Sequence, residues 1–292
     1  MTQRQRIALF GYGHVGKAMA AMLIKRFDVL VYDPVVMTES NASHMHFVHH
    51  PSEIKECVLS VIAVPTPMDA DGSCDTRLVE QSLRNAPSTL VLIKSTIAPG
   101  TTDRLRAQTG KRIVFSPEYI GESSYFNPYF GKDMIEVPFL ICGGEKQDIR
   151  HIIDLLLPIL GPTKKYFQTT ALNAEIIKYM ENVYFAAKVT FMNEMYEICE
   201  TFGADWHEVR EGWLLDPRVE PMHTAVFADK RGFGGKCYPK DLNALIAASQ
   251  RAGYNPELLQ QVKRSNEFFT QKNGASKNPL SSIVPIKLPV SD

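Results

Sequence analysis

Cys237 is the residue whose type and surroundings most clearly suggest chemistry. It lies in the stretch Gly232-Phe-Gly-Gly-Lys-Cys-Tyr-Pro-Lys-Asp241, where glycines precede it and Lys236 and Lys240 flank it. Glycines leave the backbone open to a ligand, and neighbouring ammonium groups favour the thiolate form of a cysteine. A thiolate beside a nicotinamide can attack a carbonyl carbon, as in aldehyde oxidation. On chemistry alone, a loop cysteine without any role fits the stretch equally well.

A glycine-rich turn near the N-terminus predicts a dinucleotide site. The residues Gly11-Tyr12-Gly13-His14-Val15-Gly16 follow an apolar run and open a stretch with helical spacing. In this pattern Gly11 permits the tight turn, Gly13 lets backbone N–H groups approach the pyrophosphate, and Gly16 allows close packing of helix on strand. The helix N-terminus adds partial positive charge for the phosphates. The competing interpretation is a glycine-rich turn that binds no ligand.

Asp33, which ends the second apolar run, indicates the type of cofactor. Its carboxylate can accept a hydrogen bond from a ribose 2′-hydroxyl and would repel a 2′-phosphate. The sequence therefore predicts NAD rather than NADP.

Short apolar runs in the first part of the chain are typical of strands buried on both faces. They are Ile7–Phe10, Val29–Tyr32, Val58–Val64, Leu90–Lys94, Ile113–Phe115 and Phe139–Cys142. Val15–Phe27, between the first two, has apolar residues at helical spacing, and another helix is expected near Gln147–Leu156. Pro158, Gly161 and Pro162 then interrupt the pattern. We therefore expect an α/β fold in which residues 1–162 form a Rossmann domain with a doubly wound parallel sheet.

Helices dominate the prediction beyond residue 162. The stretch from Leu172 to about Phe202 contains no Gly or Pro, and its three- and four-residue apolar spacing predicts one long linking helix. Further helices are expected at Asp205–Gly212, Asp241–Ala252 and Pro256–Phe269. Residues 163–270 are thus predicted to form a small all-α domain that carries Cys237. Residues 271–292 lack periodicity and are predicted to be a poorly ordered tail.

The bulk composition excludes several classes of function. Lys and Arg together number 32, as do Asp and Glu, so the net charge is zero, which argues against nucleic-acid binding. No apolar run approaches the ~20 residues that cross a bilayer, and the N-terminus lacks the apolar segment of a signal peptide. We therefore expect no membrane association.

The cysteines and histidines give no sign of a metal or disulfide framework. The five cysteines lie far apart without a CxxC pair, which suits a reducing cytosol, so a cytoplasmic protein is expected. The cluster His44, His46, His49 and His50 matches no standard zinc spacing. The sequence predicts no metal site.

Six motifs together resemble the UDP-glucose/GDP-mannose dehydrogenase family. The Cys237 stretch is similar to the family pattern GxGGxCxPKD, and the glycine turn matches GxGxVG. The others follow in the family's order: Val64-Pro-Thr-Pro67, Lys94-Ser-Thr96, Ser116-Pro-Glu118, and Ala174-Glu-Ile-Ile-Lys178 with Asn182 one turn later. The resemblance covers about residues 6–270, and so many ordered motifs are unexpected by chance.

The resemblance implies a four-electron oxidation of a primary alcohol to a carboxylate with two NAD. Cys237 would attack the aldehyde formed in the first step, and the resulting thiohemiacetal would be oxidised to a thioester that water hydrolyses. Lys178 would stabilise the oxyanion, and Asn182, four residues later on the same helix face, would hold the substrate oxygen. Asp241 would orient a water as base.

Further site residues also follow from the resemblance. Glu118 would assist thioester hydrolysis, Thr96 would anchor the water network, and Lys240 would add positive charge. Lys94 is interpreted only as a strand-end residue. Residues implied to contact NAD are the glycine turn (Gly11 to Gly16), Asp33, Val64, Pro65, Thr66, Ser95, Thr96 and Lys240. Residues implied to contact substrate are Glu118, Tyr119, Ile120, Gly121, Glu122, Lys178, Asn182, Arg218, Phe233 and Gly234.

Each of these polar residues has a plainer interpretation. Lys178 and Asn182 could form an exposed polar stripe on the long helix. Glu118 could simply cap the turn after Pro117. Their occurrence together with Cys237 favours the catalytic interpretation.

The resemblance further implies a nucleotide-sugar substrate, with UDP-glucose as the best single candidate, and surface polysaccharide precursors as the usual products. It implies a homodimer formed largely through the long helix, with Arg218 reaching across to the sugar. Two departures from the family are expected: the usual C-terminal third domain is predicted to be missing, and Gly121 stands where arginine is common.

Two other functions remain open from the sequence. A two-domain β-hydroxyacid dehydrogenase shares the Rossmann start and a Lys-x-x-x-Asn pair, but it makes a single hydride transfer and needs no cysteine. The other is a truncated paralogue that binds NAD without turnover.

Overall fold

The computed structural model describes residues 4–36, 43–120 and 133–273. Its strands are β1 (Arg6–Phe10), β2 (Asp28–Tyr32), β3 (Met45–Phe47), β4 (Cys57–Ile62), β5 (Leu90–Ile93), β6 (Arg112–Phe115), β7 (Phe139–Gly143) and β8 (Lys165–Thr169). Its helices are α1 (His14–Leu23), α2 (Arg77–Asn85), α3 (Thr101–Thr109), α4 (Lys146–Leu160), α5 (Ala171–Phe202), α6 (Trp206–Trp213), α7 (Tyr238–Arg251) and α8 (Glu257–Gln271), with a short 3₁₀ turn at Pro51–Glu53.

The strands form one sheet with the order β3-β2-β1-β4-β5-β6-β7-β8. Every neighbouring pair is parallel except β6 and β7, which meet in antiparallel orientation. The chain runs from β1 outward to β2 and β3, then returns to the other side of β1 with β4. This reversal of strand order is the position at which doubly wound sheets bind ligands. The predicted fold class is confirmed.

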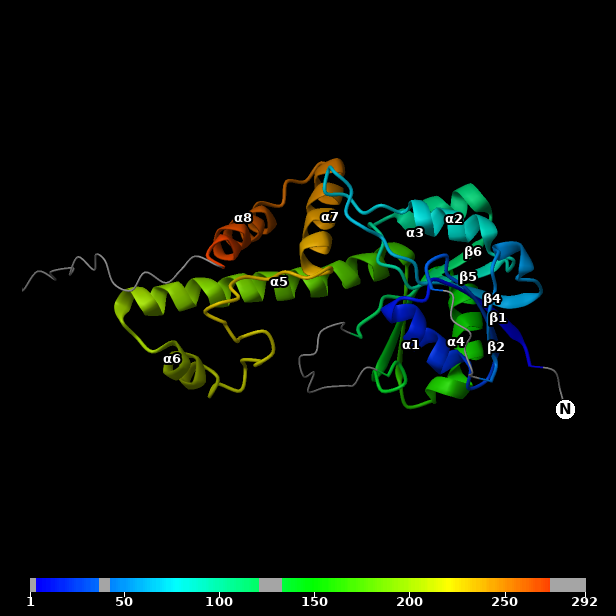
Figure 1. Cartoon of the computed structure of the whole chain (residues 1–292), viewed down its shortest axis with the longest axis horizontal. Helices are drawn as coiled ribbons and strands as arrows, with labels where there is room; N and C mark the ends of the chain where they lie inside the picture. Colours follow the sequence, from blue (N-terminus) through cyan, green and yellow to red (C-terminus); the bar gives the residue numbers. More distant parts are fainter. Residues whose placement is uncertain (1–3, 37–42, 121–132, 274–292) are drawn as a thin grey trace, which may run out of the picture. The chain divides into compact units, whose positions relative to one another are not determined.

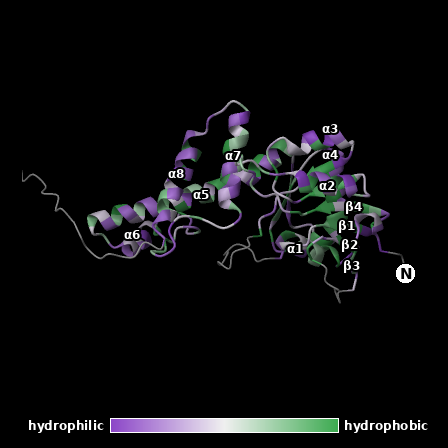
Figure 2. Ribbon diagram, turned by 45° about the horizontal axis from the view of Figure 1, so that its top comes forward, coloured by the Kyte–Doolittle hydropathy of each residue, from purple (hydrophilic) through white to green (hydrophobic). Residues whose placement is uncertain are grey.

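Helices cover both faces of this sheet, as Figure 1 shows. One buried cluster joins the strands to α1 and α4 through side chains such as Met19, Leu23 and Ile152. The other joins them to α2 and α3 through Val79 and Leu105, among others. Most strand residues are hydrophobic in Figure 2, which is typical of a sheet whose central strands are buried on both sides.

The chain divides into two compact units. The first comprises residues 1–187 and 234–260, and the second comprises residues 188–233 and 261–292. The helix α5 contributes residues to both units, so this division falls inside a helix. The predicted domain boundaries at residues 162 and 270 stay a prediction.

Several element boundaries differ from the sequence prediction. The long helix α5 is confirmed at 32 residues. The helix α7 begins at Tyr238 rather than Asp241, because Pro239 sits in the first turn, where its missing N–H costs nothing. Pro158 lies inside the last turn of α4, and the helix continues to Leu160, followed by Gly161 as its C-cap with φ +80°. The predicted tail lies outside the described residues from 274 onward.

In the part of the chain that the structure describes, no helix is both long and apolar enough to span a membrane.

Candidate functional site

The glycine turn after β1 is shaped by close backbone contacts. Gly11 has φ +93°, and a Cβ there would come within 2.5 Å of the Ala63 carbonyl oxygen. A Cβ on Gly16 would lie 2.1 Å from the Gly11 oxygen, so the helix start packs directly on the turn. Around Gly13, in contrast, an added Cβ would meet no heavy atom within 4 Å. The turn therefore needs two glycines for its own packing and leaves the third open to a ligand.

Asp33 connects the end of β2 to this turn. Its Oδ2 accepts the Tyr12 N–H at 2.7 Å, and its Oδ1 accepts the N–H groups of Val35 and Val36 at 2.8 and 3.0 Å. A carboxylate has about four acceptor positions, so these bonds leave room for a ribose hydroxyl on Oδ2.

The first turn of α1 has unused donors. The helix has no side-chain cap at its N-terminus, and the His14 Nε2 atom is buried without a hydrogen-bond partner among the described residues. Uncapped N–H groups at a helix N-terminus suit an anion. Together with the open backbone at Gly13, these features fit the pyrophosphate and ribose of a dinucleotide.

Two loops at the carboxyl edge of the sheet are tied together beside this turn. The Ser95 hydroxyl donates to the Val64 carbonyl at 2.7 Å, and the Thr66 hydroxyl donates to the Thr96 carbonyl at 2.7 Å. These bonds fix the segments that follow β4 and β5. The structure thus brings together four of the residues predicted to contact NAD, and Pro65 lies between two of them.

A chain of buried polar groups connects α5 to α7. The Lys178 Nζ donates to Asn182 Oδ1 at 3.3 Å, and the Asn182 amide donates to Asp241 Oδ2 at 2.5 Å. The Lys240 ammonium donates to Asp241 Oδ1 at 2.5 Å. Lys178, Asn182 and Asp241 are 8%, 7% and 1% exposed. They are therefore not the exposed stripe of the plainer interpretation, because burial of such groups requires partners.

The charge of Lys178 is compensated from several sides. Its ammonium lies over the Tyr119 ring, 4.9 Å from the centroid, which is favourable for a desolvated cation. Burial raises the pKa of the Tyr119 phenol, so the ring stays neutral. Burial also raises the pKa of Glu181, and the nearby Lys178 opposes that shift. The site thus holds a cation in a largely dry environment.

Cys237 differs from the other cysteines in its surroundings. It occupies the N-cap position of α7, is exposed, and its carbonyl accepts the Asp241 N–H at 2.8 Å. Helix N-termini favour the thiolate. Burial raises the pKa of Cys57 and of Cys142 to about 11, so those thiols stay protonated at neutral pH. Cys237 is the best placed nucleophile of the described residues.

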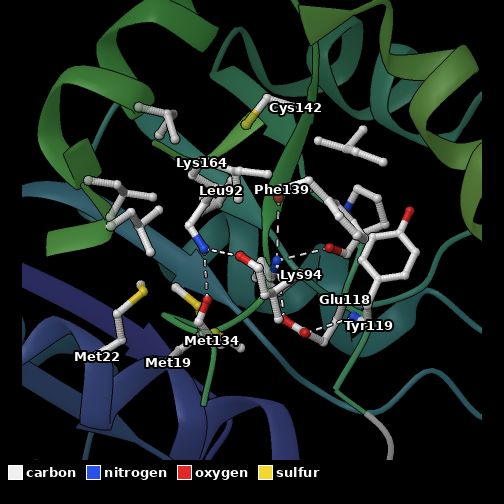
Figure 3. Close-up of a pocket in the computed structure, with 18 residues that line it drawn as sticks. Met19, Met22, Leu92, Lys94, Glu118, Tyr119, Met134, Phe139, Cys142 and Lys164 are labelled. Atoms are coloured by element: carbon white, nitrogen blue, oxygen red, sulfur yellow. Dashed lines mark hydrogen bonds and ion pairs between the residues drawn. The ribbon is translucent and has the colours of Figure 1, made fainter. Parts of the chain in front are cut away.

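Glu118 lies in a tight turn after β6. Its Oε1 accepts the N–H groups of Tyr119 and Ile120 at 2.7 and 2.9 Å, so it does cap the turn. Its Oε2 lies 3.3 Å from the Lys94 Nζ, in an ion pair that is almost fully buried (Figure 3). The sequence treated Lys94 only as a strand-end residue and missed this pair, because the two residues are far apart in the chain.

The cavity drawn in Figure 3 is not large enough for a substrate. It has a volume of about 30 Å³ and is lined mostly by apolar side chains, with Lys94, Glu118 and Lys164 as its charged residues. Ligand pockets usually exceed about 300 Å³, whereas a water needs only about 10–15 Å³. The cavity can hold water beside the ion pair.

Some predicted substrate residues lie elsewhere. Gly121 and Glu122 are outside the described residues. Arg218 and Phe233 belong to the second unit, where Arg218 pairs with Asp216 at 2.5 Å and its side chain is 88% exposed. Gly234 belongs to the first unit.

The second unit anchors the residues just before Gly234, which the sequence analysis did not anticipate. The buried Arg231 donates to Asn193 Oδ1 at 2.8 Å and to Glu197 Oε1 at 2.7 Å, and it stacks on Tyr196 at 4.3 Å. Asn266 Oδ1 accepts the Phe233 N–H at 2.7 Å. The sequence signal that could have indicated these contacts is the presence of single polar residues, Asn193 and Asn266, inside long helices.

No cluster of metal-binding side chains occurs in the described ranges. His44 instead contacts Asp28 at 2.8 Å, and His50 contacts Ser52 at 2.7 Å.

The chain matches two family models over most of its length. Residues 31–156 match the NAD binding domain of the UDP-glucose/GDP-mannose dehydrogenase family, and residues 172–268 match its central domain. The first match confirms the predicted cofactor, NAD.

Individual proteins support the same relationship. The chain is 32% identical over 238 residues to the UDP-glucose 6-dehydrogenase AglM of Haloferax volcanii, covering 74% of this chain and 53% of that one. A UDP-glucose dehydrogenase from Pyrobaculum islandicum has the same fold, with a TM-score of 0.76 at 24% identity over 91% of this chain and 69% of that one. A 3-hydroxyisobutyrate dehydrogenase from Mycobacterium tuberculosis also shares the fold, with a TM-score of 0.67 at 21% identity over 91% of this chain and 94% of that one.

The chain spans between about half and two thirds of the length of the curated relatives that it matches first. The matched regions run from residue 31, near the end of β2, through most of the Rossmann sheet, and they include the segments that carry Lys178, Asn182, Cys237 and Asp241. The chain belongs to the UDP-glucose/GDP-mannose dehydrogenase family.

Proposed function

We propose that the protein is an NAD-dependent nucleotide-sugar 6-dehydrogenase that oxidises a primary alcohol to a carboxylate, with UDP-glucose as the leading substrate. One observation carries the proposal: α7 presents Cys237 and Asp241 one turn apart, and hydrogen bonds connect Asp241 to Asn182 and Lys178 on α5. A nucleophile, a carboxylate, an amide and a cation are thus held on two helices of one unit.

The first oxidation removes a proton from the alcohol oxygen and a hydride from the alcohol carbon. Asp241, a buried carboxylate held by Lys240 and Asn182, orients the water that takes the alcohol proton. Lys178 and Asn182 hold the oxygen that becomes the aldehyde oxygen. Two NAD molecules, bound one after the other, would supply the hydride acceptors for this step and for the next.

The second oxidation uses Cys237. Its thiolate attacks the aldehyde carbon, a carbon–sulfur bond forms, and Lys178 stabilises the resulting oxyanion. Loss of the second hydride leaves a thioester on Cys237. Water adds to the thioester carbon, the carbon–sulfur bond breaks, and the carboxylate and thiolate are released. Glu118 and Thr96 hold this water, because the backbone N–H groups bond to Oε1 of Glu118 and leave Oε2 able to accept.

A homodimer is proposed because α5 exposes a regular apolar stripe. Ile176, Met180, Tyr184, Phe191 and Ile198 are 43%, 71%, 57%, 54% and 41% exposed. Their spacings of four and seven residues place them along one side of the helix. A long stripe of this kind favours burial against a second copy of itself. The exposed Arg218 is then available to the partner's site.

The compartment and pathway follow from the same chemistry. A cysteine that must act as a thiolate needs a reducing environment, so we place the protein in the cytoplasm. Sugar acids of this type serve as precursors of surface polysaccharides.

A single-step β-hydroxyacid dehydrogenase is the second candidate. The fold shared with the M. tuberculosis 3-hydroxyisobutyrate dehydrogenase over 94% of that chain favours it. That reaction needs a lysine and an amide but no nucleophile, so it leaves Cys237 at the α7 N-terminus without a role. The third candidate, a protein that binds NAD without turnover, gives no role to the buried, hydrogen-bonded side chains of Lys178, Asn182 and Asp241.

The proposal is tested by incubating the chain with NAD and UDP- and GDP-sugars and measuring both NADH and the mass of the protein. The expected result is NADH release and an adduct on Cys237 with the mass of the nucleotide sugar. Cys237→Ala should abolish the adduct and complete turnover, whereas the matched control Cys57→Ala should retain both. NADH release that survives unchanged in Cys237→Ala would contradict the covalent mechanism.

A further inference from the structure

Lys94 is a buried cation that the proposed mechanism does not use. It follows β5 directly, and its side chain is only 5% exposed. Its backbone N–H donates to the Ile62 carbonyl at 2.8 Å, which fixes the residue at the carboxyl edge of the sheet. A buried ammonium is costly unless its charge and its protons are matched. Its partners therefore indicate what the side chain does.

Among the described residues, the hydrogen-bond and ion-pair partners of the Lys94 ammonium lie in one short segment after β6 (Figure 3). The Nζ lies 3.3 Å from Glu118 Oε2, donates to Ser116 Oγ at 3.3 Å and donates to the Pro117 carbonyl at 3.1 Å. The Lys94 ammonium thus contacts three consecutive residues. The side chain fastens this segment to β5 and supplies the counter-charge to Glu118.

This arrangement determines which acceptor position of Glu118 stays available. Oε1 accepts two backbone N–H groups, from Tyr119 and Ile120, and the Lys94 Nζ lies 3.3 Å from Oε2. Of the about four acceptor positions on a carboxylate, those on Oε1 are thus filled, and the remaining ones are on Oε2. Glu118 is therefore held in one orientation, with Oε2 as the oxygen that can accept from a water.

The same segment also places an aromatic ring beneath Lys178. Tyr119 directly follows Glu118, and its ring lies 4.9 Å from the Lys178 Nζ. The ring also meets Phe139 edge-on, with centroids 4.9 Å apart. Fixing residues 116–118 thus fixes the position of the ring that supports the cation on α5.

We propose that Lys94 is a positioning residue, whose ion pair with Glu118 orients that carboxylate for thioester hydrolysis and holds the following ring under Lys178. The catalytic part of this inference rests on the proposed function. The orientation of Glu118 does not, so the two can be tested separately.

Amide hydrogen exchange at Tyr119 and Ile120 reports the orientation directly, because both N–H groups donate to Glu118. In Lys94→Met these two amides should exchange about tenfold faster or more, and Lys94→Arg should restore most of the protection. Lys94→Met alone leaves the buried Glu118 charge unpaired and could destabilise the fold. The double variant Lys94→Met with Glu118→Gln removes both charges and should therefore fold. It should show the same fast exchange. Lys164→Met is the matched control.

Lys164 is a suitable control because it is also a buried lysine beside the cavity, but it donates to the carbonyls of Met134, Ile135 and Val137. Its loss should lower overall stability without selective exchange at Tyr119 and Ile120. Equal exchange in the Lys94 and Lys164 variants, or unchanged exchange in Lys94→Met and in the double variant, would overturn the inference whether or not the protein is active.

Turnover then tests the catalytic part. In Lys94→Met, kcat should fall about tenfold or more with little change in the KM for NAD, the Cys237 adduct should accumulate, and Lys94→Arg should recover most of kcat. An unchanged kcat in folded Lys94→Met would overturn the catalytic part alone. A wild-type chain that forms no NADH from any sugar would instead refute the proposed function and, with it, the catalytic part, while hydrogen exchange still decides the orientation.

Discussion

Replacing Glu175 with glutamine should weaken the junction between α5 and α3. Glu175 is fully buried on α5, three residues before Lys178. Its Oε2 accepts the Gly100 N–H at 2.5 Å, and its Oε1 accepts the Thr102 N–H at 2.8 Å and the Thr102 hydroxyl at 2.6 Å. Gly100 has no side chain to cap α3, so this carboxylate supplies the cap from another helix.

The cost follows from these bonds. A glutamine can keep its oxygen toward Thr102, but its amide NH₂ then faces the Gly100 N–H, and a buried donor without a partner costs about 1–3 kcal/mol. We expect Glu175→Gln to lower the free energy of unfolding by about 1–3 kcal/mol.

The pH dependence has a definite sign. Burial raises the pKa of Glu175 more than its hydrogen bonds lower it, so the folded state binds this proton more tightly than the unfolded state. The stability that this group contributes is therefore complete below the unfolded pKa, about 4.3, and decreases as pH rises toward the raised folded value. The difference between wild type and Glu175→Gln should be largest at acid pH and smaller at neutral pH.

Urea unfolding at several pH values measures this difference. Circular dichroism is the suitable signal, because both tryptophans, Trp206 and Trp213, lie in the other compact unit. Asp103→Asn is the control, since Asp103 lies in the first turn of the same helix but its side chain is 51% exposed. It should cost no more than about 0.5–1 kcal/mol. A Glu175→Gln difference below that of the control, or one that grows as pH rises, would refute the reasoning.

Other consequences can be tested in parallel. At pH 8, iodoacetamide should modify Cys237 well before Cys57 and Cys142, whose pKa values of about 11 keep them protonated; peptide mass mapping would expose a different order. Gly16→Ala should destabilise the fold by about 1–3 kcal/mol or more, because its Cβ would meet the Gly11 oxygen at 2.1 Å. Gly13→Ala should fold normally but bind NAD about tenfold or more weakly, and equal NAD affinity by calorimetry would contradict the open-cradle interpretation. Met180→Glu, at a position 71% exposed, should shift the mass measured by light scattering from dimer to monomer, and a dimer that persists would argue against the α5 stripe.

The parts of the fold that the sequence predicted are those with strong local signals. Gly11 and Gly16 are required by contacts within the turn itself, so their spacing alone indicates the turn. The helix α5 has uninterrupted apolar periodicity over 32 residues, and the strands β1, β4 and β5 are almost entirely apolar. In each case the information lies within one segment of the chain.

The elements and contacts that the sequence did not predict individually have weak local signals or depend on residues far apart in the chain. The edge strand β8, with the sequence Lys-Tyr-Phe-Gln-Thr, is mostly exposed and lacks an apolar run. The helix α3 is short and polar and is capped by Glu175 from α5, which no local pattern reveals. The ion pair between Lys94 and Glu118 likewise depends on β5 and β6 lying side by side. Local patterns predict neither contact, because each requires the assembled sheet.

For the site, the sequence predicted residue types and the structure supplied their connections. Lys178 and Asn182 were expected to share a helix face, and they do. Their bond to Asp241 joins residues 59 positions apart. The chain of hydrogen bonds that makes these residues one site could therefore emerge only from the fold.

The most direct test of the central claim is the number of NADH molecules formed for each molecule of nucleotide sugar consumed. The account predicts two NADH for each sugar, with a uronate as product and with complete turnover lost in Cys237→Ala. One NADH for each substrate, with activity retained in Cys237→Ala, would contradict the Cys237 mechanism and identify a single-step dehydrogenase.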